Sequence, residues 1–214
     1  ENRLIVIEGL RRFQDTKNVG LRALIDVCTN KKAITTSTIG YIIAPRINAS
    51  GRLGCASRSV ELFLTDDSKK AAELADDLCK ENTIRQQTEQ RMFAEALEYI
   101  QEHPEMEEDK ILVIPHRNWH HGIVGIVSSK ITEKFYKPSI LFAVEGDEAK
   151  GSGRSIDNFN LFGALENCSD LLDKFGGHEL AAGLSMQADK IDEFRKRINQ
   201  CSEEKIDTVQ MVPT

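Results

Sequence analysis

Residues 67–103 contain neither glycine nor proline, and this stretch limits the possible folds more than any other. Apolar residues recur at helical spacing at both of its ends, whereas residues 80–91 are almost wholly polar, with Ile84 the exception. A helix with amphipathic ends and a polar middle suits a rod that joins two separately packed lobes. We therefore expect one helix of about 50 Å, which Pro104 ends. The alternative is a broken helix whose central face is exposed to solvent.

The residues before this stretch predict a small helical lobe. Apolar residues at helical spacing indicate helices over residues 2–12 and 19–28, and a further short helix over 59–64. Between them, residues 46–52 are expected to form a turn.

Strands and helices alternate after the long helix. Short apolar runs predict strands, and longer amphipathic runs predict helices. This alternation favours an α/β domain with a mixed, partly parallel sheet. The expected strands are 111–114, 139–144, 149–155 and 181–186, and the expected helices are 122–135, 161–167 and 191–201.

Composition excludes several classes of protein. The net charge of −6 argues against a protein that coats duplex DNA through bulk electrostatics, so any contact with nucleic acid has to be local. The five cysteines are scattered without a Cys-x-x-Cys spacing, which indicates neither a disulfide framework nor a zinc site. No apolar run is long enough to span a membrane. We expect a cytoplasmic protein with no membrane partner.

Two glycine-rich segments carry side chains that suit phosphate. The first is Gly151-Ser152-Gly153-Arg154-Ser155 and the second is Gly176-Gly177-His178. Glycine lets backbone N–H groups approach an anion, while Ser152, Arg154 and His178 supply further donors. In an extended segment, Ser152 and Arg154 point to the same side and can converge on one terminal phosphate. The alternative is that each glycine pair only makes a tight turn.

Two further motifs complete the pattern. Residues 45–52 (Pro-Arg-Ile-Asn-Ala-Ser-Gly-Arg) place two arginines and an asparagine close together, and residues 119–127 begin with Trp119-His120-His121-Gly122. In order and character, the four motifs resemble the downstream half of the RecJ single-strand-specific exonucleases. The Gly-Gly-His motif also resembles that of the wider DHHA1 domain, which occurs in DHH phosphoesterases and alanyl-tRNA synthetases.

The resemblance implies roles for the motif residues. Ser152 and Arg154, with Gly153 between them, would bind a terminal 5′ phosphate. Gly176, Gly177 and His178 would lie near the scissile region. Arg46, Asn48 and Arg52 would face the metal site from the other lobe and contact substrate phosphate. The small residues Ser50 and Cys55 in and near the first motif are mild departures from the family pattern.

The metal-binding motif of that superfamily is missing from the sequence. Trp119 rather than an aspartate precedes His120-His121, so this pair is not an Asp-His-His motif. We expect His120 to order the start of the following helix and Trp119 to pack rather than to stack on a base. By resemblance, Mn²⁺ or Mg²⁺ would be bound in the full-length enzyme by residues outside this chain. The chain by itself is therefore expected to lack nuclease activity.

The sequence thus predicts four parts of a longer protein. The chain begins at Glu1 without a methionine, and its last residues resemble a cut inside a linker. The parts are the end of a DHH domain (1–66), a connecting helix (67–105), a DHHA1 domain (106–204) and a linker to a missing C-terminal region (205–214).

Three functions remain open at this point. The first is the substrate-binding half of a metal-dependent 5′-to-3′ single-stranded-DNA exonuclease that acts in DNA repair and recombination. The second is a related phosphodiesterase that acts on oligonucleotides or cyclic dinucleotides. The third is a DHHA1 nucleic-acid-binding module without catalysis. None of them identifies a protein partner.

Overall fold

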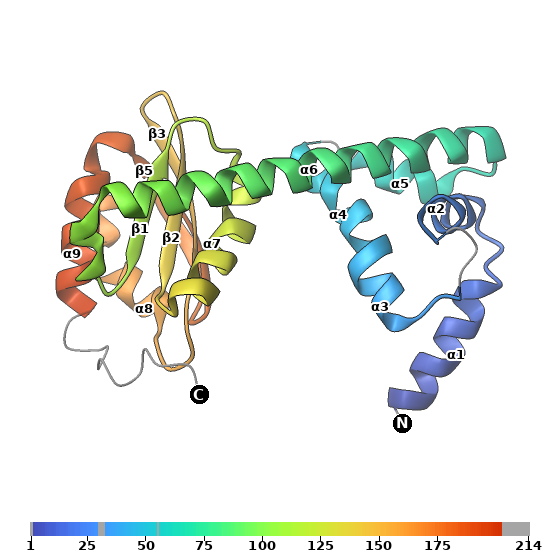
Figure 1. Ribbon diagram of the computed structural model, residues 1–214, viewed down its shortest axis with the longest axis horizontal. Helices are drawn as coiled ribbons and strands as arrows, with labels where there is room; N and C mark the ends of the chain where they lie inside the picture. The colour runs from blue at the N-terminus through green and yellow to red at the C-terminus, as the bar shows by residue number, and fades with distance from the viewer. Residues whose placement is uncertain (1, 30–32, 55, 203–214) are drawn as a thin grey trace. The chain divides into compact units, whose positions relative to one another are not determined.

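A computed structural model describes residues 2–29, 33–54 and 56–202 of the chain (Figure 1). Cys55 and the linker expected at 205–214 lie outside the described residues. The chain divides into two compact units, residues 1–87 and 88–214, and the division falls within helix α6 (Ser68–Glu102). Each unit is considered by itself below.

The long helix expected from the sequence is confirmed, because α6 is one continuous helix of 35 residues. At its start, the Asp67 carboxylate accepts a 2.8 Å hydrogen bond from the backbone N–H of Lys69. Its polar middle is less solvated than the sequence suggests, since Asn82 and Glu89 are buried. Glu89 forms an ion pair with Lys130. Part of the polar stretch therefore packs through charge pairs instead of facing solvent.

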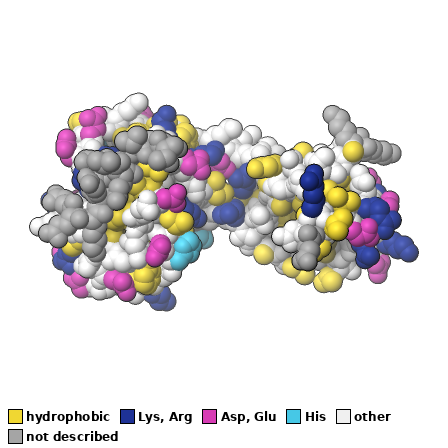
Figure 2. Space-filling model, turned by 90° about the horizontal axis from the view of Figure 1, so that it is seen from below, with side chains coloured by type: hydrophobic (Ala, Val, Ile, Leu, Met, Phe, Trp, Pro, Cys, Tyr) yellow, Lys and Arg dark blue, Asp and Glu magenta, His cyan; other side chains and the backbone are white. Residues whose placement is uncertain are grey.

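Helices build the first unit. The helices expected at 2–12, 19–28 and 59–64 are present with slightly longer bounds. The core lies mainly between α2, α5 and the first half of α6, whereas none of the described residues of α1 is buried. Figure 2 shows apolar side chains on the surface of this unit. In chain order its elements are α1 (Asn2–Gln14), α2 (Val19–Thr29), α3 (Thr36–Thr38), the π-helical η1 (Ile39–Ile43), α4 (Ala44–Leu53) and α5 (Ser57–Leu64).

The expected turn over residues 46–52 is wrong, because this motif forms most of helix α4. Pro45 sits in the first turn of the helix, where its missing N–H costs nothing. Ala49 and Ser50 are buried, and the Ser50 hydroxyl lies 2.7 Å from that of Ser59. The helix ends at Gly54, whose φ of 111° is left-handed. Asn48, Gly51 and Arg52 are therefore the exposed part of a helix whose other face is packed.

The second unit is a three-layer α/β domain, which confirms the fold class (Figure 1). Its sheet has the order β1-β2-β3-β5-β4; β1 and β2 are parallel and the other pairs are antiparallel. The strands are β1 (Leu112–His116), β2 (Ser139–Glu145), β3 (Glu148–Arg154), β4 (Lys174–His178) and β5 (Ala181–Gln187).

Helices cover the two faces of this sheet unequally. Helix α7 (His121–Phe135) packs on β2 and β3 on one face. The main core fills the other face, beneath α8 (Leu161–Glu166) and α9 (Ile191–Ser202). Short 3-10 turns complete the unit: η2 (Pro104–Glu107), η3 (Ser169–Leu171) and η4 (Ala188–Lys190). The β4–β5 side of the α7 face carries no helix among the described elements, and the candidate site lies there.

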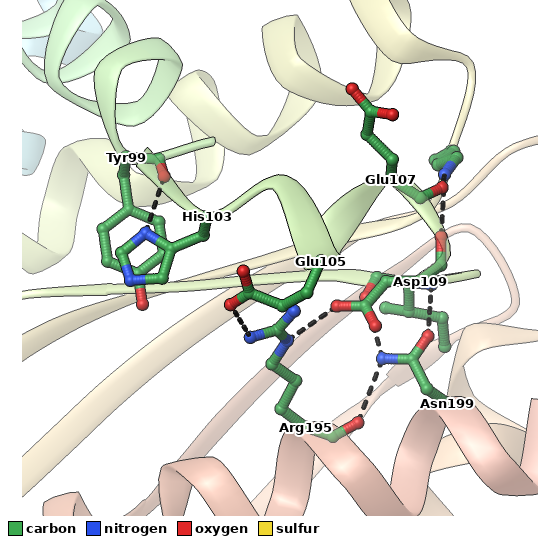
Figure 3. A network of polar contacts seen from close by, with 9 residues as sticks. Tyr99, His103, Glu105, Glu107, Asp109, Arg195 and Asn199 are labelled. Atoms are coloured by element: carbon green, nitrogen blue, oxygen red, sulfur yellow. Dashed lines mark hydrogen bonds and ion pairs between the residues drawn. The ribbon is translucent and has the colours of Figure 1, made fainter. Parts of the chain in front are cut away.

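A polar network fixes the segment that leads into β1 (Figure 3). The Asn199 side chain accepts a 2.8 Å hydrogen bond from the N–H of Ile111 and donates a 3.1 Å bond to its carbonyl. Arg195 donates a 2.6 Å bond to Asp109 and a 3.3 Å bond to Glu105. These contacts anchor α9 to the beginning of the sheet.

Candidate functional site

Ser152 and Arg154 lie on the same side of β3, as their spacing predicts. The Arg154 guanidinium donates hydrogen bonds to the Ser152 hydroxyl at 3.1 Å and to the Gly153 carbonyl at 2.7 Å. Both side chains are half-buried. A hydroxyl and a guanidinium thus converge at one place, which is an arrangement that suits an oxyanion.

The glycines of this motif serve the packing of the core. Gly151 and Gly153 point to the face opposite Ser152. A Cβ at Gly151 would lie 2.6 Å from the Phe142 ring, and one at Gly153 would lie 2.8 Å from Leu161. Core packing therefore explains why these positions are glycine, and a part for Gly153 in phosphate binding stays a prediction.

Gly125 of α7 is a site residue that sequence reasoning did not single out. A Cβ at this position would lie 2.9 Å from the Ser152 hydroxyl oxygen and 3.0 Å from the Arg154 guanidinium. The helix thus approaches both donors closely enough that only a glycine fits without moving them. A glycine inside the apolar run of residues 123–127 was the available signal, since helix propensity gives no reason for it there.

The second glycine motif is an edge strand and not the tight turn that was the alternative for its glycine pair. Residues 174–178 form β4, which pairs with β5, and the sequence analysis missed this strand. Its two glycines and its exposed polar residues hid the alternation that normally identifies a strand. Only the β4–β5 pairing makes this segment part of the sheet.

Strand β5 brings the two motifs together on one face. Arg154 pairs with Ala181, which pairs with His178 on its other side. Ser152 pairs in the same way with Gly183, which pairs with Gly176. Directly paired residues in antiparallel strands point to the same side, and strands lie about 4.8 Å apart. His178 therefore lies about 10 Å from Arg154, measured between backbones.

Small residues leave the space between these donors open. A Cβ at Gly176 or at Gly183 would meet no other atom within 4 Å. Gly177 has a different role, because its φ of 151° disfavours other residues and a Cβ there would overlap the carbonyl of Ala181. His178 is exposed, and its Nδ1 accepts a 3.3 Å hydrogen bond from the N–H of Leu180. The face thus combines a fixed backbone with open room above it.

The Trp119-His120 motif has structural roles, as expected. Trp119 is buried, and its indole N–H donates a 2.7 Å hydrogen bond to Glu95. His120 is the N-cap of α7, where its Nδ1 accepts a 3.1 Å hydrogen bond from the N–H of Gly122. Burial, together with the neighbouring His121 ring, holds the pKa of His120 below its usual value.

This cap makes the stability of the second unit depend on pH. Because the pKa of His120 is lower in the folded state, the unfolded chain binds a proton first as the pH falls below about 6.5. The contribution of the cap to the free energy of unfolding is therefore complete above that pH and decreases below it. Asparagine caps a helix without titrating. We therefore expect the free energy of unfolding of His120→Asn to decrease less steeply than that of the wild-type chain between about pH 7 and pH 5. Urea unfolding at several pH values measures this, and an unchanged pH profile would contradict it.

The first unit holds the other group of expected site residues. Arg46 is half-buried and donates a hydrogen bond to the carbonyl of Ile42, while its Nε is buried with no hydrogen-bond partner among the described residues. Asn48 and Arg52 are exposed and lie one helical turn apart on one face of α4. Side chains two residues apart on a helix point in directions that differ by about 200° around its axis. The structure therefore brings Asn48 and Arg52 together and directs Arg46 elsewhere.

Among residues 2–29, 33–54 and 56–202, no group of three or more His, Cys, Asp or Glu side chains is arranged to hold a metal ion. The side chains present thus do not fit a catalytic metal. Over the same residues, no helix is long and apolar enough to cross a membrane.

Comparison with known proteins places these observations in a family. Residues 108–204 match the DHHA1 domain. The chain is 36% identical over its whole length to the single-stranded-DNA-specific exonuclease RecJ of Bacillus subtilis, and 41% identical over 98% of its length to RecJ of Dickeya dadantii. It spans 27% and 38% of the lengths of these two relatives.

Solved structures give the same result. The crystal structure of RecJ in complex with Mg²⁺ from Thermus thermophilus superposes with a TM-score of 0.84 at 34% identity, over 96% of this chain and 32% of that one. A structure of exonuclease RecJ bound to manganese also superposes with a TM-score of 0.84, at 35% identity, over 99% of this chain and 52% of that one.

Proposed function

Since this chain belongs to the RecJ family over the length that it shares with these relatives, we propose that it is the substrate-binding part of a metal-dependent exonuclease. The enzyme would degrade single-stranded DNA in the 5′-to-3′ direction, in DNA repair and recombination. One observation carries this proposal: β5 places Arg154, Ser152 and His178 on a single open sheet face.

We assign the recognition of the 5′ end to Ser152 and Arg154. A terminal phosphate carries more charge than an internal phosphodiester, and a guanidinium with an adjacent hydroxyl can bind two of its oxygens at once. Gly176 and Gly183 leave room beside it for the first sugar and base. His178, and the backbone of Gly176 and Gly177, would then lie closer to the first phosphodiester bond.

The first unit carries a second group of donors for substrate phosphate. Asn48 and Arg52, which share a face of α4, are suited to contact phosphate without reading sequence. Arg46, whose Nε is buried and whose guanidinium also donates to the Ile42 carbonyl, would contact substrate phosphate through its remaining N–H groups.

In this proposal, other residues would hold the catalytic metal ion. The solved relatives contain Mg²⁺ or manganese, and such an ion would activate water and neutralise developing charge. Residues beyond those described here would hold it. The part of this chain is to bind and orient the strand. Within the described residues no helix could cross a membrane and the cysteines are free, and we place the enzyme in the cytoplasm.

Gly125→Ala tests the pocket. Alanine favours the helix by up to about 1 kcal/mol, so the fold should persist, but its methyl group displaces Ser152 and Arg154. We expect the variant to lose most of the preference for a 5′-phosphorylated over a 5′-hydroxyl strand that we predict for the wild-type chain. Fluorescence anisotropy with the two oligonucleotides measures the preference.

Gly9→Ala is the matched control, since Gly9 also lies inside a helix and a Cβ there meets no atom within 4 Å. A wild-type chain without any 5′-phosphate preference would refute the assignment of end recognition. A Gly125→Ala variant that keeps the full preference would remove the pocket from this position.

A further inference from the structure

Residues paired across β3, β5 and β4 form rows on the open face of the sheet. The first row is Arg154, Ala181 and His178, and the middle row is Ser152, Gly183 and Gly176. The open face continues beyond these two rows. One step further along the strands, Lys150 of β3 pairs with Ser185 of β5, and Ser185 pairs with Lys174 of β4. Lys150 lies two residues from Ser152, and Lys174 lies two residues from Gly176. Alternation along a strand therefore directs all three side chains to the same face as Ser152. Two ammonium groups thus flank one hydroxyl.

These lysines are available to a ligand. Both are exposed, and neither takes part in a salt bridge or side-chain hydrogen bond within the described part of the chain. The nearest acidic positions are Glu148, two residues before Lys150, and Asp173, next to Lys174.

Lys150 also borders a cavity of about 410 Å³ at the start of α7. The other charged side chains that line this cavity are Arg117, Glu145 and Glu148. Cations and carboxylates are balanced inside the cavity. Glu148 shares the face of Lys150 by the same alternation, whereas the row of Lys150, Ser185 and Lys174 itself carries two cations and no carboxylate.

The three rows are regularly spaced. Successive rows are two residues apart, which is about 6.7 Å along a strand. The first row carries Arg154 and His178, the middle row only Ser152 and glycines, and the third row the two lysines. A phosphate at the first row and a phosphate at the third would be separated by about 13 Å, with the small residues of the middle row beneath the chain that connects them.

We propose that Lys150, Ser185 and Lys174 form a second phosphate site, which binds an internal phosphodiester of a single DNA strand. This inference rests on the proposed function, which places the 5′ phosphate of the same strand at Ser152 and Arg154. Lysine suits an internal site, because an ammonium group is a point charge that attracts any phosphodiester and does not demand the two free oxygens of a terminal phosphate. The third row adds affinity for the strand without reading its end.

The dependence of binding on salt tests the proposal. For single strands, log K falls with log salt concentration with a slope of about −0.7 for each phosphate that is neutralised. We expect Lys150→Ala/Lys174→Ala to bind a 5′-phosphorylated strand of about 12 nucleotides with a slope shallower by roughly 0.7. The same reduction is expected for the 5′-hydroxyl strand. Binding of thymidine 5′-monophosphate, which has no internal phosphodiester, should not change.

Two variants control for net charge. Lys190→Ala/Lys196→Ala removes the same charge from exposed positions of η4 and α9, and it should keep the wild-type slope. Lys150→Arg/Lys174→Arg keeps the charge and should also show the wild-type slope. A wild-type slope in Lys150→Ala/Lys174→Ala, or the same reduction in Lys190→Ala/Lys196→Ala, overturns the second site.

The result for the lysine site can be distinguished from the result for recognition of the 5′ end. If the wild-type chain binds both strands equally, the assignment of Ser152 and Arg154 fails, while the slopes still report on the lysines. If the chain binds no single strand at all, both proposals fail.

Discussion

Replacing Arg154 with alanine is expected to weaken the binding of a 5′-phosphorylated single strand about ten- to hundredfold and to affect a 5′-hydroxyl strand far less. The guanidinium lies within hydrogen-bond distance of the Ser152 hydroxyl, so the two groups can hold one phosphate together. Loss of a charge-assisted hydrogen bond costs on the order of 1.5–3 kcal/mol, which corresponds to that change in affinity. Titration of the chain with the two oligonucleotides gives the ratio directly.

Two other arginine variants define what the result means. Arg154→Lys keeps the charge but loses the planar pair of donors, and it should recover only part of the preference. Arg46→Ala should weaken both strands similarly, since its proposed partner is an internal or scissile phosphate. An equal loss for both strands in Arg154→Ala would make Arg154 a general backbone contact or a structural residue.

The largest expected effect on stability comes from Gly20→Ala in α2. A Cβ at Gly20 would overlap the carbonyl oxygen of Leu62 and lie 2.6 Å from its carbonyl carbon. Backbone cannot rotate away as a side chain can, so α2 and α5 would have to separate and open the core around Leu24 and Leu62. We expect a loss of about 3 kcal/mol in the free energy of unfolding, at the upper end of the usual cost of overpacking.

Gly9→Ala is the control for this substitution. Gly9 lies in α1, where a Cβ meets nothing within 4 Å, and the variant should be neutral or more stable by up to about 1 kcal/mol. Far-ultraviolet circular dichroism in urea follows all helices, whereas the fluorescence of Trp119, the single tryptophan, reports on residues 88–214. The loss should be seen mainly in the dichroism. Equal stabilities of Gly20→Ala and Gly9→Ala would show that α2 and α5 do not meet as closely as described.

Periodic segments were predictable from the sequence, and segments that depend on distant partners were not. The helix over 67–103 and strands such as 139–144 have strong patterns of their own, and the structure confirms them. Helix α4 was mistaken for a turn, because its Pro, Asn and Gly residues have turn propensity, while its stability comes from Ala49 and Ser50 packed against other helices. Strand β4 was missed, because only its pairing with β5 makes it a strand.

In the candidate site, too, the local relations were predictable and the relations between distant segments were not. The spacing of Ser152 and Arg154 predicted that they share a side, because alternation is local to one strand. Nothing local relates either residue to His178, since that relation depends on the register of β5 between them. The close approach of Gly125 to Ser152 and Arg154 depends on how α7 crosses the sheet. Gly153 was interpreted as a phosphate-binding residue, although its missing side chain makes room for Leu161.

The small residues of β5 on the open face have a consequence for the divergence of such proteins. Ala181, Gly183 and Ser185 lie between the donors of β3 and β4 and make no direct contribution of charge. The height available above the middle row is thus set by its two glycines, Gly183 beside Ser152 and Gly176 on β4, since a Cβ at either position would meet no other atom within 4 Å. A descendant of this chain could exclude bulky end groups, or admit only a bare phosphate, by changing one of these two glycines, with Ser152 and Arg154 left in place.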